Sequence, residues 1–98
     1  MTVTLKKEGT ELFATVEGKL DTLTAPQLGD KLAAELEGVT KATFDFKELE
    51  YISSAGLRVL VSTAQKMGET GEIVIKNVSD DIMGIFEATG FDEAFKFE

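Results

Sequence analysis

The spacing of apolar residues changes repeatedly along this chain, from every second residue to about every fourth and back. Val3 and Leu5 stand at alternate positions, whereas Leu28, Leu32 and Leu36 recur every four residues. Alternation is typical of a strand with one buried face, and the longer spacing is typical of an amphipathic helix. The order of these segments predicts two strands, then a helix, a strand, a helix, a strand and a helix. A short last strand near the C-terminus stays open.

Glycines, serines and threonines mark the ends of the segments. We expect strands in 2–9, 11–18, 41–46 and 72–78, helices in 24–38, 57–67 and 79–90, a loop in 47–52 and a short tail in 91–98, which could fray although its three phenylalanines favour burial. The first helix has the T-x-x-Q pattern of a capping box at Thr24 and Gln27, with Pro26 tolerated in the first turn. Ser79 and Gly90 are suitable caps for the last helix. The pattern predicts one α/β domain over residues 1–98.

Composition excludes several classes of function. The 98 residues include no cysteine and no histidine, which removes disulfides, thiolate catalysis and the commonest general base. Eighteen acidic residues against ten basic ones give a formal net charge of -8. That charge repels phosphate backbones, so no nucleic-acid partner is expected. The chain has no run of about 20 apolar residues and no signal-like start, so we expect a cytoplasmic protein without membrane insertion.

Few residues are candidates for chemistry. Asp21 and Asp45 lie near predicted strand ends and could share a metal, but their spacing alone is a weak signal. Ser53 and Ser54 directly precede a helical pattern, where serine is a common N-cap. The same position faces free N–H groups and the positive end of the helix dipole, which would favour a phosphate on a serine. Autonomous serine catalysis is not expected, because the chain has no histidine to activate the hydroxyl.

Three segments together resemble the STAS domain, in the small form that acts as a bacterial anti-sigma-factor antagonist. "GKLD" followed by "TAPQL" resembles the first motif of that family. "TFDFKELEYISSAGLRVLV" resembles its centre, and "IVIKNVSDDIMGIFEATGFDEAFKF" resembles its closing strand, helix and tail. The resemblance spans nearly the whole chain. It implies a mixed sheet of four to five strands, with three or more helices packed mainly on one side.

The resemblance also implies a regulatory function. The unphosphorylated form of such a domain binds an anti-sigma factor of the histidine-kinase-like ATPase fold, and thereby releases a sigma factor. That partner phosphorylates a serine, which abolishes binding, and a serine phosphatase reverses the modification. The domain needs no cofactor and is not an enzyme. A constitutive scaffold subunit in a lipid-transport or other multi-protein complex is the alternative, and a metal enzyme using Asp21 and Asp45 is a remote third.

Aligning "YISSAGL" with the family motif places the phosphoacceptor at Ser54, with Ser53 as second choice. Ser53 stands where the family has an aspartate, and Ala55 stands where it has serine or threonine. Arg58 stands where glycine is frequent and shares a helix face with Ser54, where it could either pair with a phosphate or lie solvated. The expected partner-binding residues are Asp21, Thr24, Tyr51, Ser53, Ser54, Ala55, Gly56 and Arg58.

Overall fold

The computed structural model describes residues 1–69 and 71–98 as a mixed sheet with helices on one face. The strands are β1 (Thr2–Glu8), β2 (Glu11–Leu20), β3 (Lys41–Asp45), β4 (Leu49–Ile52), β5 (Glu72–Lys76) and β6 (Lys96–Phe97). The helices are α1 (Ala25–Glu35), α2 (Ser54–Met67), α3 (Asp80–Thr89) and the short 3₁₀ helix η1 (Phe91–Ala94).

The sheet has the order β1-β2-β3-β5-β6, and β4 pairs with β2 beyond the point where β3 ends. Among the described strands, β1 alone runs antiparallel to its neighbour, and the other pairs are parallel. The chain therefore has to cross over the sheet between β2 and β3 and between β3 and β5, and α1 and α2 lie in these two connections. The α/β class that the sequence predicts is confirmed.

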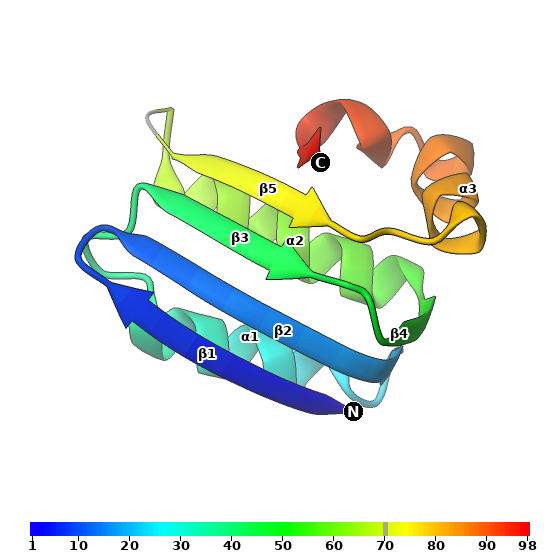
Figure 1. Ribbon diagram of the computed structural model, residues 1–98, viewed down its shortest axis with the longest axis horizontal. Coiled ribbons are helices and arrows are strands. Elements are labelled where there is room, and N and C mark those ends of the chain that lie inside the picture. The colour runs from blue at the N-terminus through cyan, green and yellow to red at the C-terminus, as the bar shows by residue number, and fades with distance from the viewer. Residues whose placement is uncertain (70) are drawn as a thin grey trace.

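Both crossover helices lie on the same face of the sheet (Figure 1). The alternation along β2 explains the core, because Leu12, Ala14 and Val16 are buried while Phe13 between them is 37% exposed. The buried face packs against the apolar stripe of α1, of which Leu28 and Leu32 are buried. The prediction of helices mainly on one side is confirmed.

Within the described residues the sheet has six strands, one more than the upper limit of the four to five predicted. The additional strand is β4, which lies in the segment predicted as a loop. Its burial does not alternate, because Leu49 and Ile52 are buried and Glu50 and Tyr51 between them are exposed. Without a period of two, this segment gave no strand signal, and it forms a strand because β2 offers it a partner.

The C-terminal tail is ordered against the core, so the expectation that it could fray is wrong. Phe86 of α3 makes edge-to-face contacts with Phe95 and Phe97, at ring-centroid distances of 5.8 and 5.2 Å. Lys96 and Phe97 then pair with β5, which confirms the last strand that the sequence left open. Aromatic burial supplies enough apolar contact to hold this segment in place.

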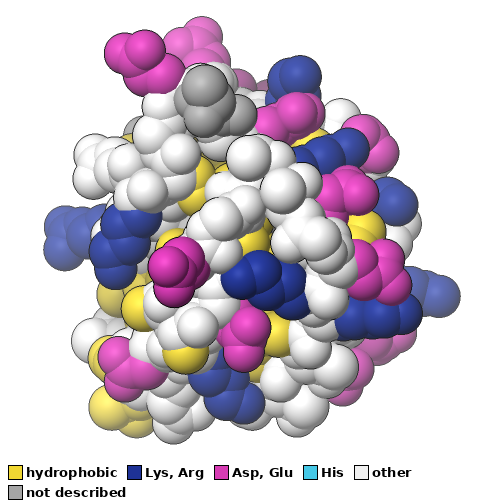
Figure 2. All heavy atoms as spheres, turned by 90° about the vertical axis from the view of Figure 1, so that its left-hand side faces the viewer, with side chains coloured by type: hydrophobic (Ala, Val, Ile, Leu, Met, Phe, Trp, Pro, Cys, Tyr) yellow, Lys and Arg dark blue, Asp and Glu magenta, His cyan; other side chains and the backbone are white. Residues whose placement is uncertain are grey.

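Charges of both signs are mixed on the surface. Figure 2 shows the end of the molecule that carries the β1–β2 turn, where lysines and arginines alternate with acidic side chains and form no broad basic area on that face. In the part of the chain that the structure describes, no helix has both the length and the apolar character needed to cross a membrane.

Candidate functional site

The candidate site forms where the carboxyl ends of β2 and β4 meet. The N–H of Ser53 donates a hydrogen bond of 2.8 Å to the carbonyl of Leu20, and the N–H of Gly18 donates one of 3.0 Å to the carbonyl of Glu48. These bonds place the loop after β2 beside the start of α2, although about 30 residues separate them in the chain. Asp21 and the 47–51 segment therefore lie near the serine pair.

The β2–β4 pair contains a bulge. Gly18 lies opposite Leu49 and Lys19 lies opposite Tyr51, so Glu50 of β4 is the extra residue. Gly18 has a φ of +89°, a conformation that glycine adopts without a Cβ penalty, which explains the residue type at this point. Residues 11–15 of β2 pair with β3, and residues 18–20 pair with β4.

The two serines have different positions at the start of α2. Ser53 is the N-cap of α2, and its Oγ accepts a hydrogen bond of 3.3 Å from the N–H of Gly56. Ser54 is the first residue of the helix and is exposed. The N–H of Gly56 is bonded to the Ser53 side chain and that of Leu57 to the Ser53 carbonyl, which leaves the N–H groups of Ser54 and Ala55 without an acceptor in the described part of the chain. The Ser54 hydroxyl therefore lies beside two free donors at the positive end of the helix dipole.

Gly56 is buried and brings α2 close to β2. A Cβ at this position would lie 2.7 Å from Cγ of Leu20 and 3.0 Å from both the Leu20 carbonyl oxygen and Cγ1 of Ile52. Only glycine fits without a shift of these neighbours. Gly56 therefore has a packing role, and its place on the partner-binding surface stays a prediction.

The loop after β2 is held by Asp21 and Thr24. The Asp21 carboxylate accepts hydrogen bonds of 3.0 Å from the N–H groups of both Leu23 and Thr24. These bonds, the one from the Thr24 N–H first, hold the pKa of Asp21 below its ordinary value. Asp21 is therefore an anion with a fixed orientation at the edge of the site.

The predicted capping box of α1 is wrong. Thr24 stands at the N-cap position, but its side chain makes no cap hydrogen bond. Its hydroxyl instead accepts from the N–H of Asp21 and donates to the carbonyl of Lys19, both at 2.8 Å. Pro26 lies in the first turn, as predicted. Thr24 thus closes the loop on itself, which fixes the Asp21 carboxylate.

Two large apolar side chains are exposed around the serines. Tyr51 on β4 is 46% exposed and Leu23 at the tip of the loop is 84% exposed. Exposed apolar side chains at a rigid site are typical anchors of protein interfaces. Tyr51 is among the residues predicted from the sequence. Leu23 was missed, because no pattern in the sequence distinguishes an exposed leucine in a loop from a buried one.

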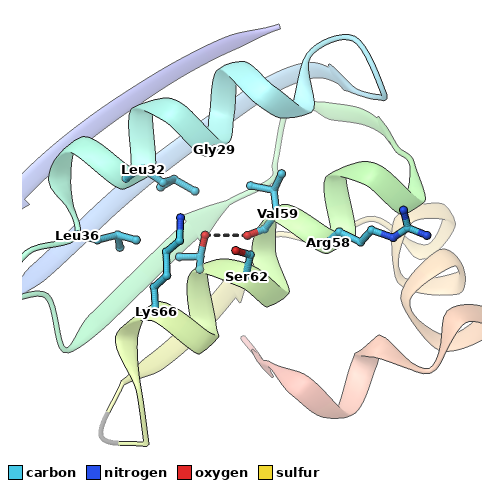
Figure 3. A pocket seen from close by; sticks show the side chains of 9 residues that line it. Gly29, Leu32, Leu36, Arg58, Val59, Ser62 and Lys66 are labelled. Carbon is cyan, nitrogen blue, oxygen red and sulfur yellow. Dashed lines mark hydrogen bonds between the residues drawn. The ribbon is translucent and has the colours of Figure 1, made fainter.

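Arg58 is exposed one turn beyond Ser54 on α2. Figure 3 shows its side chain extending along the helix, away from Ser62 and Lys66 and toward the end at which Ser54 lies. Residues four apart on a helix are neighbours, so a phosphate on Ser54 would be within range of the guanidinium. Neither of the two ion pairs in the described residues involves Arg58.

Asp45 is the last residue of β3 and bonds to residues other than those around Asp21. Its carboxylate accepts hydrogen bonds of 3.0 Å from the Asn77 side-chain amide and from the N–H of Lys47, and the Asn77 bond is the main reason for its lowered pKa. Asp21 and Asp45 thus both serve as acceptors for turns. Within residues 1–69 and 71–98, no cluster of three or more acidic side chains could hold a metal ion.

The sheet order, the crossover helices and the serine at the start of α2 agree with the result of a family comparison. The family model described as "STAS domain" matches residues 2–98. The chain belongs to the STAS domain family. The resemblance inferred from the three sequence motifs is thereby confirmed.

Several named proteins are similar to this STAS domain in sequence or in structure. BtrV of Bordetella bronchiseptica, provisionally named an anti-sigma factor antagonist, is 34% identical over 97 residues, covering 97% of this chain and 84% of BtrV. The anti-sigma-B factor antagonist of Bacillus subtilis is 26% identical over 92 residues, covering 93% and 84% of the two chains. An anti-sigma-factor antagonist (STAS) domain protein from Planctomyces limnophilus superposes with a TM-score of 0.87 at 17% identity, covering 98% and 87%. The last likeness shows the fold alone.

Proposed function

We propose that this STAS domain is an anti-sigma-factor antagonist switched by phosphorylation of Ser54. In this proposal the unmodified domain binds an anti-sigma factor of the histidine-kinase-like ATPase fold, and a sigma factor is released. The same partner transfers the γ-phosphoryl group of ATP to Ser54, and a serine phosphatase removes it. ATP and magnesium come with the kinase, so the domain itself needs no cofactor, has no catalytic group and acts in the cytoplasm.

The observation that carries the proposal is the position of Ser54. Its hydroxyl is exposed at the start of α2, and the neighbouring Ser53 side chain is occupied with Gly56. A kinase can reach Ser54 without opening the helix, whereas a reaction at Ser53 would remove its cap hydrogen bond. The proposed binding surface consists of Asp21, Leu23, Thr24, Tyr51, Ser53, Ser54, Ala55 and Arg58.

A phosphate on Ser54 would act on the partner and not on the fold. It would add a charge of roughly -1.5 to -2 at the positive end of α2, where free N–H groups and Arg58 offset it. At a closely packed interface the same group would add bulk and a charge that must lose its water. The proposed switch therefore blocks the interface while the domain stays folded.

The test is phosphorylation by the cognate anti-sigma factor with Mg-ATP, followed by mass spectrometry of the modified peptide. We expect one phosphate, lost in Ser54→Ala and retained in Ser53→Asp. The aspartate keeps an acceptor for the N–H of Gly56, so α2 keeps its cap in this control. The Ser53→Asp variant also restores the residue that the family motif has at this position.

Three results would contradict the proposal in different ways. A phosphate found only on Ser53 would move the switch by one residue. Stable binding of the anti-sigma factor without any phosphorylation would make the domain an antagonist with another form of control. An absence of binding, with the domain co-purifying instead with subunits of a transport complex, would favour the constitutive scaffold.

A further inference from the structure

A groove runs between α1 and α2, on the side of the domain that carries both helices. It encloses about 190 Å³. Leu32 and Leu36 of α1 and Val59 of α2 give it an apolar lining, and Ser62 and Lys66 of α2 stand on one wall (Figure 3). Arg58 of the proposed partner surface also lines the groove, whereas Lys66 lies in the last turn of α2. The groove therefore extends beyond that surface along α2.

The polar groups of the groove differ in how far they are already bonded. The Thr63 hydroxyl donates a hydrogen bond of 2.8 Å to the carbonyl of Val59, so its proton is already bonded within the helix. Among the described residues, by contrast, the Ser62 hydroxyl makes no hydrogen bond and Lys66 makes no ion pair. Ser62 and Lys66 are four apart on α2, so both face the groove from the same side. The groove thus has two free donors beside an apolar lining.

The direction of Lys66 is the more informative observation. A lysine in the last turn of a helix is favoured by the helix dipole, which accounts for the residue type at this position. The dipole does not account for the side chain extending toward Leu32 and Leu36 of α1 (Figure 3). Lys66 is exposed, and its ammonium makes no ion pair among the described residues. An anionic occupant would complement it.

We propose that the groove binds a medium-chain carboxylate. The alkyl chain would lie against Leu32, Leu36 and Val59, and the carboxylate would accept hydrogen bonds from the Lys66 ammonium and the Ser62 hydroxyl. A volume of 190 Å³ is below the ~300 Å³ of a typical drug-sized site and has room for a chain of roughly six to ten non-hydrogen atoms. The small volume and the two cations that line it, Lys66 and Arg58, favour such a molecule over a helix of another protein, which would need a longer groove.

Titration of the full ¹⁵N-labelled chain with octanoate, followed by two-dimensional amide NMR, tests the proposal. We expect saturable shifts of the amides of Gly29, Ser62 and Lys66 and of their neighbours. Octylammonium and octanol have the same chain with a positive and a neutral head group, and we expect each to bind at least about tenfold more weakly. Equal binding of all three probes would reduce the groove to an apolar hollow and overturn the proposal.

Two charge variants test whether octanoate binding depends on the lining of the groove or only on the net charge of the domain. Lys66→Glu and Lys31→Glu change the net charge by the same amount, but exposed Lys31 of α1 does not line the groove. We expect octanoate affinity to fall at least about tenfold in Lys66→Glu and to change less than about twofold in Lys31→Glu. Ala33→Phe, which places a ring in the groove from the α1 side, should also abolish binding.

The proposal fails if the two charge variants weaken binding equally, if Ala33→Phe binds normally, or if octanoate gives no saturable shifts. It also fails if an amphipathic helical peptide with glutamates on its polar face gives the expected shifts and octanoate does not. That last result would assign the groove to a protein partner. None of these outcomes depends on Ser54 or on an anti-sigma factor, so the groove and the proposed function are tested separately.

Discussion

At the scale of single residues, Gly56 and Gly29 form a matched pair within helices. A Cβ at Gly56 would come within 2.7 Å of Leu20, whereas a Cβ at Gly29 would meet nothing closer than Val59 at 3.9 Å, an ordinary contact. Alanine gains up to about 1 kcal/mol of helix propensity at either position. At Gly56 overpacking typically costs about 1–3 kcal/mol, and the Leu20 carbonyl cannot rotate away.

We therefore expect Gly56→Ala to lower the free energy of unfolding by about 1–2 kcal/mol. Gly29→Ala should leave it unchanged or raise it by up to about 1 kcal/mol. Urea unfolding followed by circular dichroism measures both. If the two variants are equally stable, the close approach of α2 to β2 at Leu20 is not as tight as described.

Leu23 is the residue for which stability and binding should separate most clearly. It is 84% exposed, so Leu23→Ala should change the free energy of unfolding by no more than about 0.5 kcal/mol. At an interface, removal of a buried apolar anchor commonly costs 2 kcal/mol or more, and we expect at least about tenfold weaker binding of the anti-sigma factor. Calorimetric titration measures the affinity, with the exposed neighbour in Thr22→Ala as control. Unchanged binding in Leu23→Ala would place the interface elsewhere.

At the scale of elements, a negative charge at Ser54 acts on the N-terminus of α2. Ser54→Asp places a carboxylate in the first turn, where the helix dipole favours it by about 0.3–1 kcal/mol. We expect the melting temperature to change by no more than a few degrees, since surface substitutions have small effects. Binding of the anti-sigma factor should weaken at least about tenfold, which is about 1.4 kcal/mol. Thermal melts and calorimetric titration of the same preparations test both expectations.

A collapsed melting temperature in Ser54→Asp would mean that charge at this position acts by unfolding the domain. Unchanged binding together with unchanged stability would remove the switch from the proposed function. Ser54→Asn is the matched control, because it has nearly the same shape as the aspartate without the charge.

At the scale of the whole molecule, two turns link stability to pH. Hydrogen bonds hold the pKa values of Asp21 and Asp45 below their ordinary range, chiefly those from the Thr24 N–H and the Asn77 amide. A carboxyl whose folded pKa lies below its unfolded value of about 3.9 stabilises the fold above that pH. That contribution is lost as the pH falls through the folded pKa. We therefore expect the free energy of unfolding to decrease on acidification from about pH 5 downward.

Asp45→Asn tests this linkage directly. Asparagine keeps an oxygen that can accept from Asn77 and Lys47 but does not titrate in this range. The variant should be less stable than the parent at pH 7, and its stability should fall less steeply with decreasing pH. Urea unfolding at several pH values between 7 and 3 measures the slopes. Identical slopes would mean that Asp45 does not contribute to the acid sensitivity.

The sequence by itself determined those features that depend on neighbours within a few residues. The stripe of Leu28 and Leu32 is sufficient for α1, and Ser79 and Gly90 mark the two ends of α3 as predicted. The central motif placed Ser54 at the start of a helix because capping by Ser53 involves only the next three residues. Capping hydrogen bonds and the spacing of apolar residues involve only neighbours in the chain, so they can be predicted without a structure.

The tertiary structure alone decided those features whose partners are distant in the chain. Residues 49–52 become a strand because residues 18–20 of β2, about 30 residues earlier in the chain, extend past the pairing with β3 and pair with them. Thr24 leaves its expected cap because Lys19 and Asp21 are better placed partners for its hydroxyl. Gly56 is buried because the start of α2 packs against Leu20 at the end of β2, and Leu23, in the loop that follows, is 84% exposed. Whether a side chain is buried depends on which segments pack against it in space, and a pattern within a few residues does not show that.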